Sequence, residues 1–330
     1  MKRIAMTTST TTFSMTDLTT SSTTPNIGDG GMGAHTSVLF AECLEALAVT
    51  ASDVVVDATV GGAGHFAALA SALGNEGTLV GIDADADAIA RGREATKESV
   101  ARVELVEDNF RNLGTILDML QLPQIDKSLF DLGWSGFQLT RGRGFSFKVD
   151  EPLYMTYGDP HAAGTVTAED IVNGYGEEEL ANLIYELGEE RFSRGIAGSI
   201  VNARRRTRIT TTGALVHAIE AGVPVFYKKG KIHPATKTFQ ALRIAVNDEY
   251  GAIREGVESA IARTREGGRI AVITFHSGED RIVKQLFRDA AKQGLGGLYT
   301  KKPIAPTREE LLQNPRARSS KLRVFVRGPA

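Results

Sequence analysis

A glycine-rich segment between two acids is the feature of this sequence that most directly suggests chemistry. Gly61-Gly-Ala-Gly64 follows a short β-branched run, Asp57 stands just before it, and Asp83 lies about twenty residues beyond it. Glycines let the main chain approach a ligand without a Cβ clash, and an acid that ends the next strand can accept both hydroxyls of a ribose. The pattern therefore predicts a site for a cofactor that contains a nucleoside.

Two details of this segment bear on which cofactor it binds. The segment lacks the third glycine of the G-x-G-x-x-G pattern, which favours a pyrophosphate. The Asp57 carboxylate would repel a pyrophosphate, but it suits the sulfonium and the α-amino group of S-adenosylmethionine. The residues thus favour S-adenosylmethionine, while a dinucleotide such as NAD in an oxidoreductase, or a tight turn beside a solvated acid, remains an alternative.

A third acid, Asp131, ends another apolar run and is followed three residues later by Trp134. Reactive groups gather at the carboxyl ends of the strands in open α/β sheets. The exocyclic amine of a base is a poor nucleophile because its lone pair is delocalised, and an acceptor beside it can orient that lone pair toward a methyl group. Asp131 is therefore a candidate catalytic residue, with Trp134 stacking on the base. The alternative is that Asp131 caps a turn and Trp134 belongs to the core.

Histidine and cysteine give less indication of chemistry. His276 follows the last expected strand, close to Glu279 and Asp280, and is a candidate proton acceptor, although a lone histidine is more often structural. The six histidines lack metal-ligand spacing, and Cys43 is the single cysteine. We therefore expect no metal site and no disulfide.

Alternating strands and helices must position these groups. We expect strands over 53–60, 78–83, 103–106, 128–131 and 269–275, and helices over 66–73 and 85–97. The β-α-β-α-β order predicts an α/β fold in which a parallel sheet carries helices on both faces.

A helical stretch then interrupts this alternation. Residues 167–222 contain four expected helices and no evident strand, and a long apolar stripe predicts one continuous helix from Thr236 to about Arg265. We therefore expect a sheet domain made of residues 35–141 plus 229–330, and an inserted helical domain of residues 142–228. Residues 1–34, a Thr/Ser-rich segment, are expected to form a disordered tail.

The charge of the chain is unevenly distributed. Its 330 residues carry 38 Lys+Arg against 40 Asp+Glu, and this net charge of −2 argues against an avid nucleic-acid binder. Residues 301–330 nevertheless hold eight basic and two acidic side chains, a local charge of +6. A basic C-terminus of this kind can hold phosphates, although a charge run is usually a solvated face. No apolar run reaches about 18 residues, so we expect no transmembrane helix.

Seven longer motifs, in order between about residue 35 and residue 327, match one family. They are His35-Thr-Ser-Val-Leu39, Asp57-Ala-Thr-Val-Gly-Gly-Ala-Gly-His65, Arg143-Gly-Phe-Ser-Phe147, Gly188-Glu-Glu-Arg-Phe192, His233-Pro-Ala-Thr-Lys-Thr-Phe-Gln-Ala-Leu-Arg243, Phe275-His-Ser-Gly-Glu-Asp-Arg-Ile-Val-Lys284 and Asn314-Pro-Arg-Ala-Arg-Ser-Ser-Lys-Leu-Arg323. On these motifs the chain resembles the bacterial 16S ribosomal RNA cytosine-N4 methyltransferases, the RsmH or MraW family.

The resemblance implies an S-adenosylmethionine-dependent enzyme with a class I, Rossmann-like methyltransferase sheet and an inserted helical domain for substrate recognition. It implies methylation of the N4 amine of cytosine 1402, in the P-site region of the small ribosomal subunit, and a cytoplasmic location. The implied partners are 16S rRNA and the small subunit, with no DNA and no membrane. Homodimers occur in the family.

The resemblance also carries a set of cofactor-binding residues onto this sequence. By position in the motifs they are Ala63, Gly64, His65, Asp83, Phe110, Asp131 and Gln138.

The chain departs from the usual family pattern at several places. Ala63 stands where the family usually has a third glycine, and Trp134 is not a general family feature. Tyr154 and Thr156 replace an acid and a base near the active-site loop, and Gly278 replaces a leucine, which predicts a change in packing. These departures keep open a third possibility, a methyltransferase-like RNA-binding protein that has lost catalysis.

Overall fold

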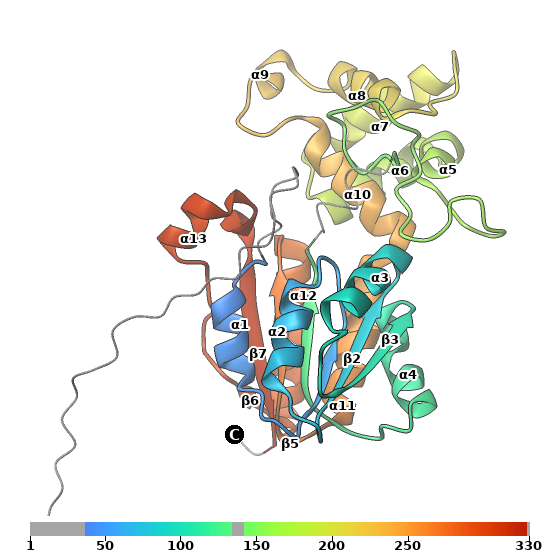
Figure 1. Ribbon diagram of the computed structural model, residues 1–330. Coiled ribbons are helices and arrows are strands. Elements are labelled where there is room, and N and C mark those ends of the chain that lie inside the picture. Colours follow the sequence, from blue (N-terminus) through green and yellow to red (C-terminus); the bar gives the residue numbers. More distant parts are fainter. Residues whose placement is uncertain (1–36, 134–141, 329–330) are drawn as a thin grey trace, which may run out of the picture. The chain divides into compact units, whose positions relative to one another are not determined.

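The computed structural model describes residues 37–133 and 142–328. The predicted tail at 1–34, Trp134 and Gln138 lie outside these described residues. The described residues include seven strands, which form one sheet in the order β3-β2-β1-β4-β5-β7-β6 (Figure 1). The predicted α/β fold with an inserted group of helices is confirmed.

Most of the sheet is parallel, as predicted. The strands from β3 to β5 pair in parallel, whereas β7 lies antiparallel between β5 and β6. Runs of β-branched and aliphatic residues, buried on both faces, favour this arrangement. The strands are β1 (Val54–Asp57), β2 (Thr78–Asp83), β3 (Arg102–Glu107), β4 (Ile125–Asp131), β5 (Thr264–Thr274), β6 (Gly296–Leu298) and β7 (Lys321–Arg327).

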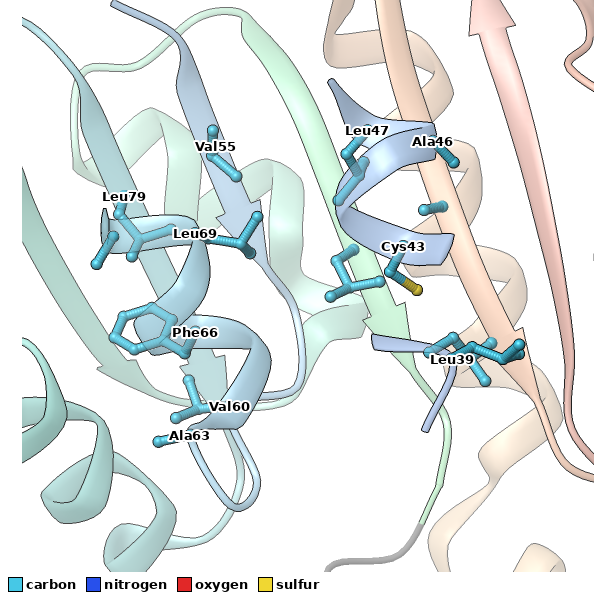
Figure 2. Packing of buried hydrophobic residues seen from close by; sticks show 14 of the residues in the cluster. Leu39, Cys43, Ala46, Leu47, Val55, Val60, Ala63, Phe66, Leu69 and Leu79 are labelled. Atoms are coloured by element: carbon cyan, nitrogen blue, oxygen red, sulfur yellow. The ribbon is translucent and has the colours of Figure 1, made fainter. Parts of the chain in front are cut away.

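Helices α1 (Phe40–Leu47), α2 (Gly64–Ala72) and α3 (Ala86–Ala95) pack on one face of the sheet. Figure 2 shows Phe66 and Leu69 of α2 near Val55 and Leu79 of the strands, all of them fully buried. This packing fixes the start of α2, and with it the glycine-rich segment that precedes the helix.

The other face is covered by α4 (Leu113–Met119), α11 (Glu249–Arg263) and α12 (Ser277–Lys292). Phe130 of β4 and Phe287 of α12 are fully buried in this second core. The helices on both faces thus hold β4 rigidly at the centre of the sheet.

A third core lies among the helices that lie between β4 and α11 in sequence. These helices are α5 (Ala168–Gly174), α6 (Glu177–Gly188), α7 (Ser193–Arg204), α8 (Thr212–Ala221), α9 (Val225–Lys228) and α10 (Ala235–Asn247). The four helices predicted over 167–222 correspond to α5 to α8. Phe239 and Leu242 of α10 belong to the same core, so this packing continues beyond residue 228. The domain boundaries at 142 and 228 stay a prediction.

The long helix predicted from Thr236 to about Arg265 is wrong in one respect. Asp248 adopts left-handed backbone angles (φ 45°), and the chain bends there into two helices, α10 and α11. The apolar stripe continues across the bend, but α10 contributes to the third core and α11 to the second. The strand that follows also begins earlier than predicted, at Thr264, and contains Gly267 and Gly268.

The C-terminal part adds a short helix α13 (Arg308–Gln313) and a 3-10 turn η3 (Pro315–Ser319) before the chain returns as β7. Ala317 of this turn is fully buried in the first core. Among the described residues, no helix combines the length and the apolar character needed to cross a membrane.

Candidate active site

A pocket lies where the parallel strands β1, β2, β3 and β4 end, which is where ligands bind in open α/β sheets. It is an open pocket, continuous with solvent. The polar residues that line it are Ser37, Thr59, His65, Asp83, Asp108, Asn109, Asp131, Tyr157, Asn247, Glu249, Glu279 and Arg316.

The glycine-rich segment forms one wall of the pocket. Gly64 lies close to Ser37, and a Cβ at this position would meet the Ser37 hydroxyl, which would have to turn away. Ala63 has left-handed backbone angles (φ 63°), a conformation that costs a residue with a side chain about 1–2 kcal/mol and explains the glycine usual in the family. Gly64 and His65 line the pocket, whereas the Ala63 side chain is buried in the core beside Val60 (Figure 2).

Asp83 ends β2 and holds two loops in place. Its Oδ2 accepts a hydrogen bond from the Gly61 N–H (2.8 Å), and its Oδ1 accepts one from the Asp85 N–H (2.9 Å). Burial raises the pKa of the Asp83 carboxyl above its ordinary value. The carboxylate therefore fixes the glycine-rich segment and also lines the pocket.

Asp57, at the end of β1, is completely buried. Its Oδ1 accepts a hydrogen bond from the Thr59 N–H (3.1 Å), and its Oδ2 has no hydrogen-bond partner among the described residues. Burial raises the pKa of Asp57 well above its ordinary value, and the neighbouring Asp131 and Asp83 carboxylates add to this effect. Asp57 is not among the residues that line the pocket, and the expected contact between its carboxylate and a sulfonium stays a prediction.

Asp131 ends β4 and is fixed from both sides. Its N–H donates to Thr59 Oγ1 (2.7 Å), and its Oδ1 accepts from the Gly133 N–H (3.0 Å). Its Oδ2 lies 3.7 Å from Nδ1 of His65, whose ring stacks on Phe40. The Asp131 side chain stays 22% exposed, so its carboxylate is accessible from the pocket.

Phe110 supplies an aromatic side chain to the same pocket. It begins the 3-10 turn η1 (Phe110–Asn112) after β3, and its ring meets Phe130 edge to face, 5.7 Å between centroids. Of the seven predicted cofactor-binding residues, the structure thus brings Gly64, His65, Asp83, Phe110 and Asp131 to one pocket. Gln138 lies outside the described residues.

The wall of the pocket beyond Asp131 contains residues that the sequence analysis did not single out as site residues. The Tyr157 hydroxyl donates to Glu249 Oε1 (2.8 Å), and the Tyr157 N–H donates to Asn247 Oδ1 (2.9 Å). Arg243 binds the same Glu249 carboxylate through two nitrogens, at 2.6 and 2.9 Å. The Asn247-Asp248 pair, which favours a helix break, was the signal in the sequence.

Glu249, His276 and Glu279 come close enough together that each offers a ligand atom within 4.8 Å of the others. These groups already have partners. Arg243 and Tyr157 bind Glu249, while Glu279 Oε2 accepts from the Phe275 N–H at 2.7 Å. The expected absence of a metal stays a prediction.

His276 is the N-cap residue of α12. Its Nδ1 accepts from the Glu279 N–H (3.4 Å), and its Nε2 lies 3.0 Å from Glu279 Oε1. His276 is not among the residues that line the pocket. These contacts give it a structural role at the helix start.

The departures from the family pattern are distributed around the site. Tyr154 packs against His161, Thr156 is buried, and neither lines the pocket. A Cβ at Gly278 would overlap the hydroxyl of Tyr250. The glycine at 278 is therefore explained by the tyrosine that fills the space beside it.

The strand order, with β7 antiparallel between β5 and β6, and a glycine-rich pocket with an acid after β2 together define a class I methyltransferase, an enzyme that uses S-adenosylmethionine. The chain belongs to the MraW methylase family, whose model matches residues 32–327. The predicted family, enzyme class and cofactor are confirmed, and the dinucleotide alternative is set aside.

Curated relatives cover nearly the whole chain. The ribosomal RNA small subunit methyltransferase H of Brevibacillus brevis is 44% identical over 306 aligned residues, and the match covers 88% of this chain and 96% of the relative. The protein of the same name from Deinococcus deserti is 45% identical over 295 residues, 89% of this chain and 93% of the relative. Among solved structures, a ribosomal RNA methylase from Streptococcus thermophilus aligns with a TM-score of 0.39 at 13% identity, covering 86% and 90% of the two chains.

Proposed function

We propose that this enzyme methylates the N4 amine of cytosine 1402 in the 16S rRNA of the small ribosomal subunit. The relatives named ribosomal RNA small subunit methyltransferase H support an rRNA substrate, since the identity extends over nearly their whole length. The observation that carries the choice of an amine is that Asp131, which lines the pocket, offers a partly exposed carboxylate as a hydrogen-bond acceptor.

The residues of the pocket fit S-adenosylmethionine. Asp83 is suited to accept the ribose hydroxyls, Phe110 to contact the adenine, and Gly64 with His65 to let the main chain approach the ligand. When bound, this cofactor supplies a methyl group made electrophilic by its positively charged sulfur.

Asp131 orients the substrate amine in this proposal. Its carboxylate accepts a hydrogen bond from the cytosine N4–H, which directs the nitrogen lone pair and holds the amine for in-line attack. Methylation requires N4 to release a proton, and Asp131 or water accepts it in this proposal. His65 Nδ1 lies 3.7 Å from Asp131 Oδ2 and is thus a titratable neighbour of this carboxylate.

The target base must leave its stack in the RNA to reach a pocket at the end of a sheet. RNA sites of this kind are recognised through backbone shape and splayed bases, and we assign that contact to the helices between β4 and β5 and to the C-terminal segment. The proposed substrate places the enzyme in the cytoplasm. A homodimer stays a prediction.

Nucleoside mass spectrometry of small-subunit rRNA tests the proposal. RNA from cells that lack this protein should lack N4-methylcytidine at the target position, and purified enzyme with S-adenosylmethionine should restore it. Unchanged N4-methylcytidine without the protein would refute the assignment. RNA binding without any methyl transfer would instead favour the RNA-binding protein that has lost catalysis.

A further inference from the structure

Arg316 stands at the pocket with its side chain exposed to solvent. It lies in η3, where Asn314, Ala317 and Ser320 are buried at intervals of three residues. The Ala317 N–H donates to the Asn314 carbonyl, and the Ser320 N–H donates to the Ala317 carbonyl, both at 3.0 Å. The buried residues thus anchor the turn, and Arg316 projects from a fixed main chain.

The charges that line the pocket are mostly negative. Carboxylates come from Asp83, Asp108, Asp131, Glu249 and Glu279. Of the pocket-lining residues in the described part of the chain, Arg316 is the one Lys or Arg side chain. A pocket of this composition repels the phosphates of an approaching RNA, so a cation at the pocket has a specific electrostatic role.

Three other basic residues near the C-terminus, all in β7, are engaged within the fold. Arg323 binds Asp280 through two nitrogens, at 2.7 and 3.1 Å, and Lys321 binds the same carboxylate at 3.1 Å. Arg327 donates to the carbonyls of Ile261 (3.0 Å) and Leu295 (2.7 Å). The motif that looked uniformly basic in sequence therefore separates into structural residues and exposed ones.

Arg316 makes no hydrogen bond and no ion pair with residues 37–133 or 142–328. Its guanidinium is therefore available to a ligand. A guanidinium presents its N–H groups as a planar fork that matches two oxygens of one phosphate.

We propose that Arg316 binds a backbone phosphate beside the target nucleotide and so holds the RNA strand at the entrance of the pocket. This inference rests on the proposed function. When a base is flipped into a pocket, its flanking phosphates remain outside, at the level of the pocket entrance. The Arg316 guanidinium can bind any group that presents a pair of anionic oxygens, so the carboxylate of S-adenosylmethionine is a second possible ligand. The solvent exposure of Arg316 favours the RNA phosphate.

The test uses the full chain with Arg316→Ala and Arg316→Lys, and with Arg318→Ala as the matched control. Arg318 lies on the same turn, is exposed and carries the same charge, but does not line the pocket. Binding of unmethylated small subunits is measured by filter retention at several salt concentrations. Binding of S-adenosylmethionine is measured by calorimetry, and unfolding temperatures check that each variant folds.

Arg316→Ala should weaken subunit binding about 10- to 100-fold and lower the slope of log affinity against log salt by about 0.7 to 0.9. Arg316→Lys should recover the salt slope but only part of the affinity, because lysine keeps the charge and loses the fork. Arg318→Ala should change subunit binding much less, and S-adenosylmethionine affinity should be unchanged in all three variants.

Three results would overturn the inference. If Arg316→Ala bound the subunit as tightly as wild type, Arg316 would make no contact with the RNA. An equal loss of affinity in Arg318→Ala would indicate a general electrostatic attraction rather than a contact at the pocket. A loss of S-adenosylmethionine affinity with intact subunit binding would assign Arg316 to the cofactor carboxylate. Failure of the proposed function is recognised separately, because wild-type enzyme would then form no N4-methylcytidine.

Discussion

The imidazole Nδ1 of His65 lies 3.7 Å from the carboxylate Oδ2 of Asp131, although the two residues come from the start of α2 and the end of β4. The His65 ring stacks on Phe40 and is 6% exposed, so it has little freedom to turn away. The pair joins the glycine-rich wall of the pocket to the acid that we assign to the substrate amine.

Asp131→Ala should reduce methyl transfer to the small subunit by at least about 100-fold, because the amine loses the acceptor that orients it. Methyl incorporation at saturating S-adenosylmethionine measures this effect, and thermal unfolding should show that the fold is retained. Full activity in this variant would remove the proposed role of Asp131.

A double-mutant cycle with His65→Gln distinguishes a pair that acts together from two independent contacts. If His65 works through Asp131, the double variant should be no less active than Asp131→Ala alone. If the fold-losses in activity of the two single variants multiply in the double variant, His65 acts separately from Asp131, as a contact to the cofactor.

Asp83→Asn should weaken S-adenosylmethionine binding by about 10- to 100-fold. An amide keeps one acceptor oxygen, so either the Gly61 or the Asp85 N–H faces an NH₂ group, and the glycine-rich segment loses part of its support. Calorimetry measures the affinity. Asp126→Asn is the matched control, because Asp126 also accepts from a main-chain N–H, that of Val54 (2.8 Å), but does not line the pocket. Equal affinity losses in both variants would contradict the role of Asp83.

Asp57→Asn should become more stable relative to wild type as the pH rises above about 4, the ordinary pKa of an aspartate carboxyl. Burial raises the pKa of Asp57 in the folded state above its unfolded value near 3.8, so the folded protein binds more protons than the unfolded chain in this range. Wild-type stability is therefore lost as the pH rises through the folded-state pKa, and the asparagine variant lacks that loss. Urea unfolding at several pH values measures the difference.

Asp150 provides a control of opposite sign for this pH dependence. A hydrogen bond from the Gly213 N–H lowers the pKa of the Asp150 carboxyl, so its contribution to stability is present above about pH 4 and lost below it. Asp150→Asn should therefore lose stability relative to wild type as the pH rises through that range. A stability difference between Asp57→Asn and wild type that does not change with pH would contradict the assignment of a raised pKa.

Gly278→Ala should destabilise the protein by about 1–3 kcal/mol, because the added methyl group meets the Tyr250 hydroxyl in a packed region. Tyr250→Leu in the same chain should recover part of the loss by removing that hydroxyl and the ring carbon behind it. Denaturant unfolding measures both. Gly174→Ala, at a position where a Cβ has open space, should be neutral or mildly stabilising. A similar cost at both glycines would show that the effect is not one of packing.

The sheet and the glycine-rich pocket could be predicted from the sequence because their signals are local. A β-branched run, a glycine turn and an acid after the next strand suffice to place Asp57, Gly64 and Asp83 at the same sheet edge. The far wall of the pocket could not be predicted in this way. Tyr157 and Glu249 are 92 residues apart, and their hydrogen bond exists only because the helices between β4 and β5 fold back onto the sheet.

Periodicity also concealed the bend at Asp248. The apolar positions on either side keep a helical spacing, yet they face different cores, and only tertiary packing distinguishes them.

The C-terminal basic run was ambiguous for a similar reason. The sequence gives only the net charge of the segment. In the structure Arg323 is paired with Asp280, so its charge is not available to a ligand.

The chain leaves the sheet after Asp131 and returns through α10 and α11 to β5, the strand directly beside β4, where Asp131 pairs with Ile273. At the end of α10, the Asn247 side chain also links the Met155 carbonyl to the Tyr157 N–H at the pocket wall. The Asn247 side chain thus ties the end of α10 to the segment that carries Tyr157. A substitution that loosens the packing of α10 would therefore displace Tyr157 from the pocket wall.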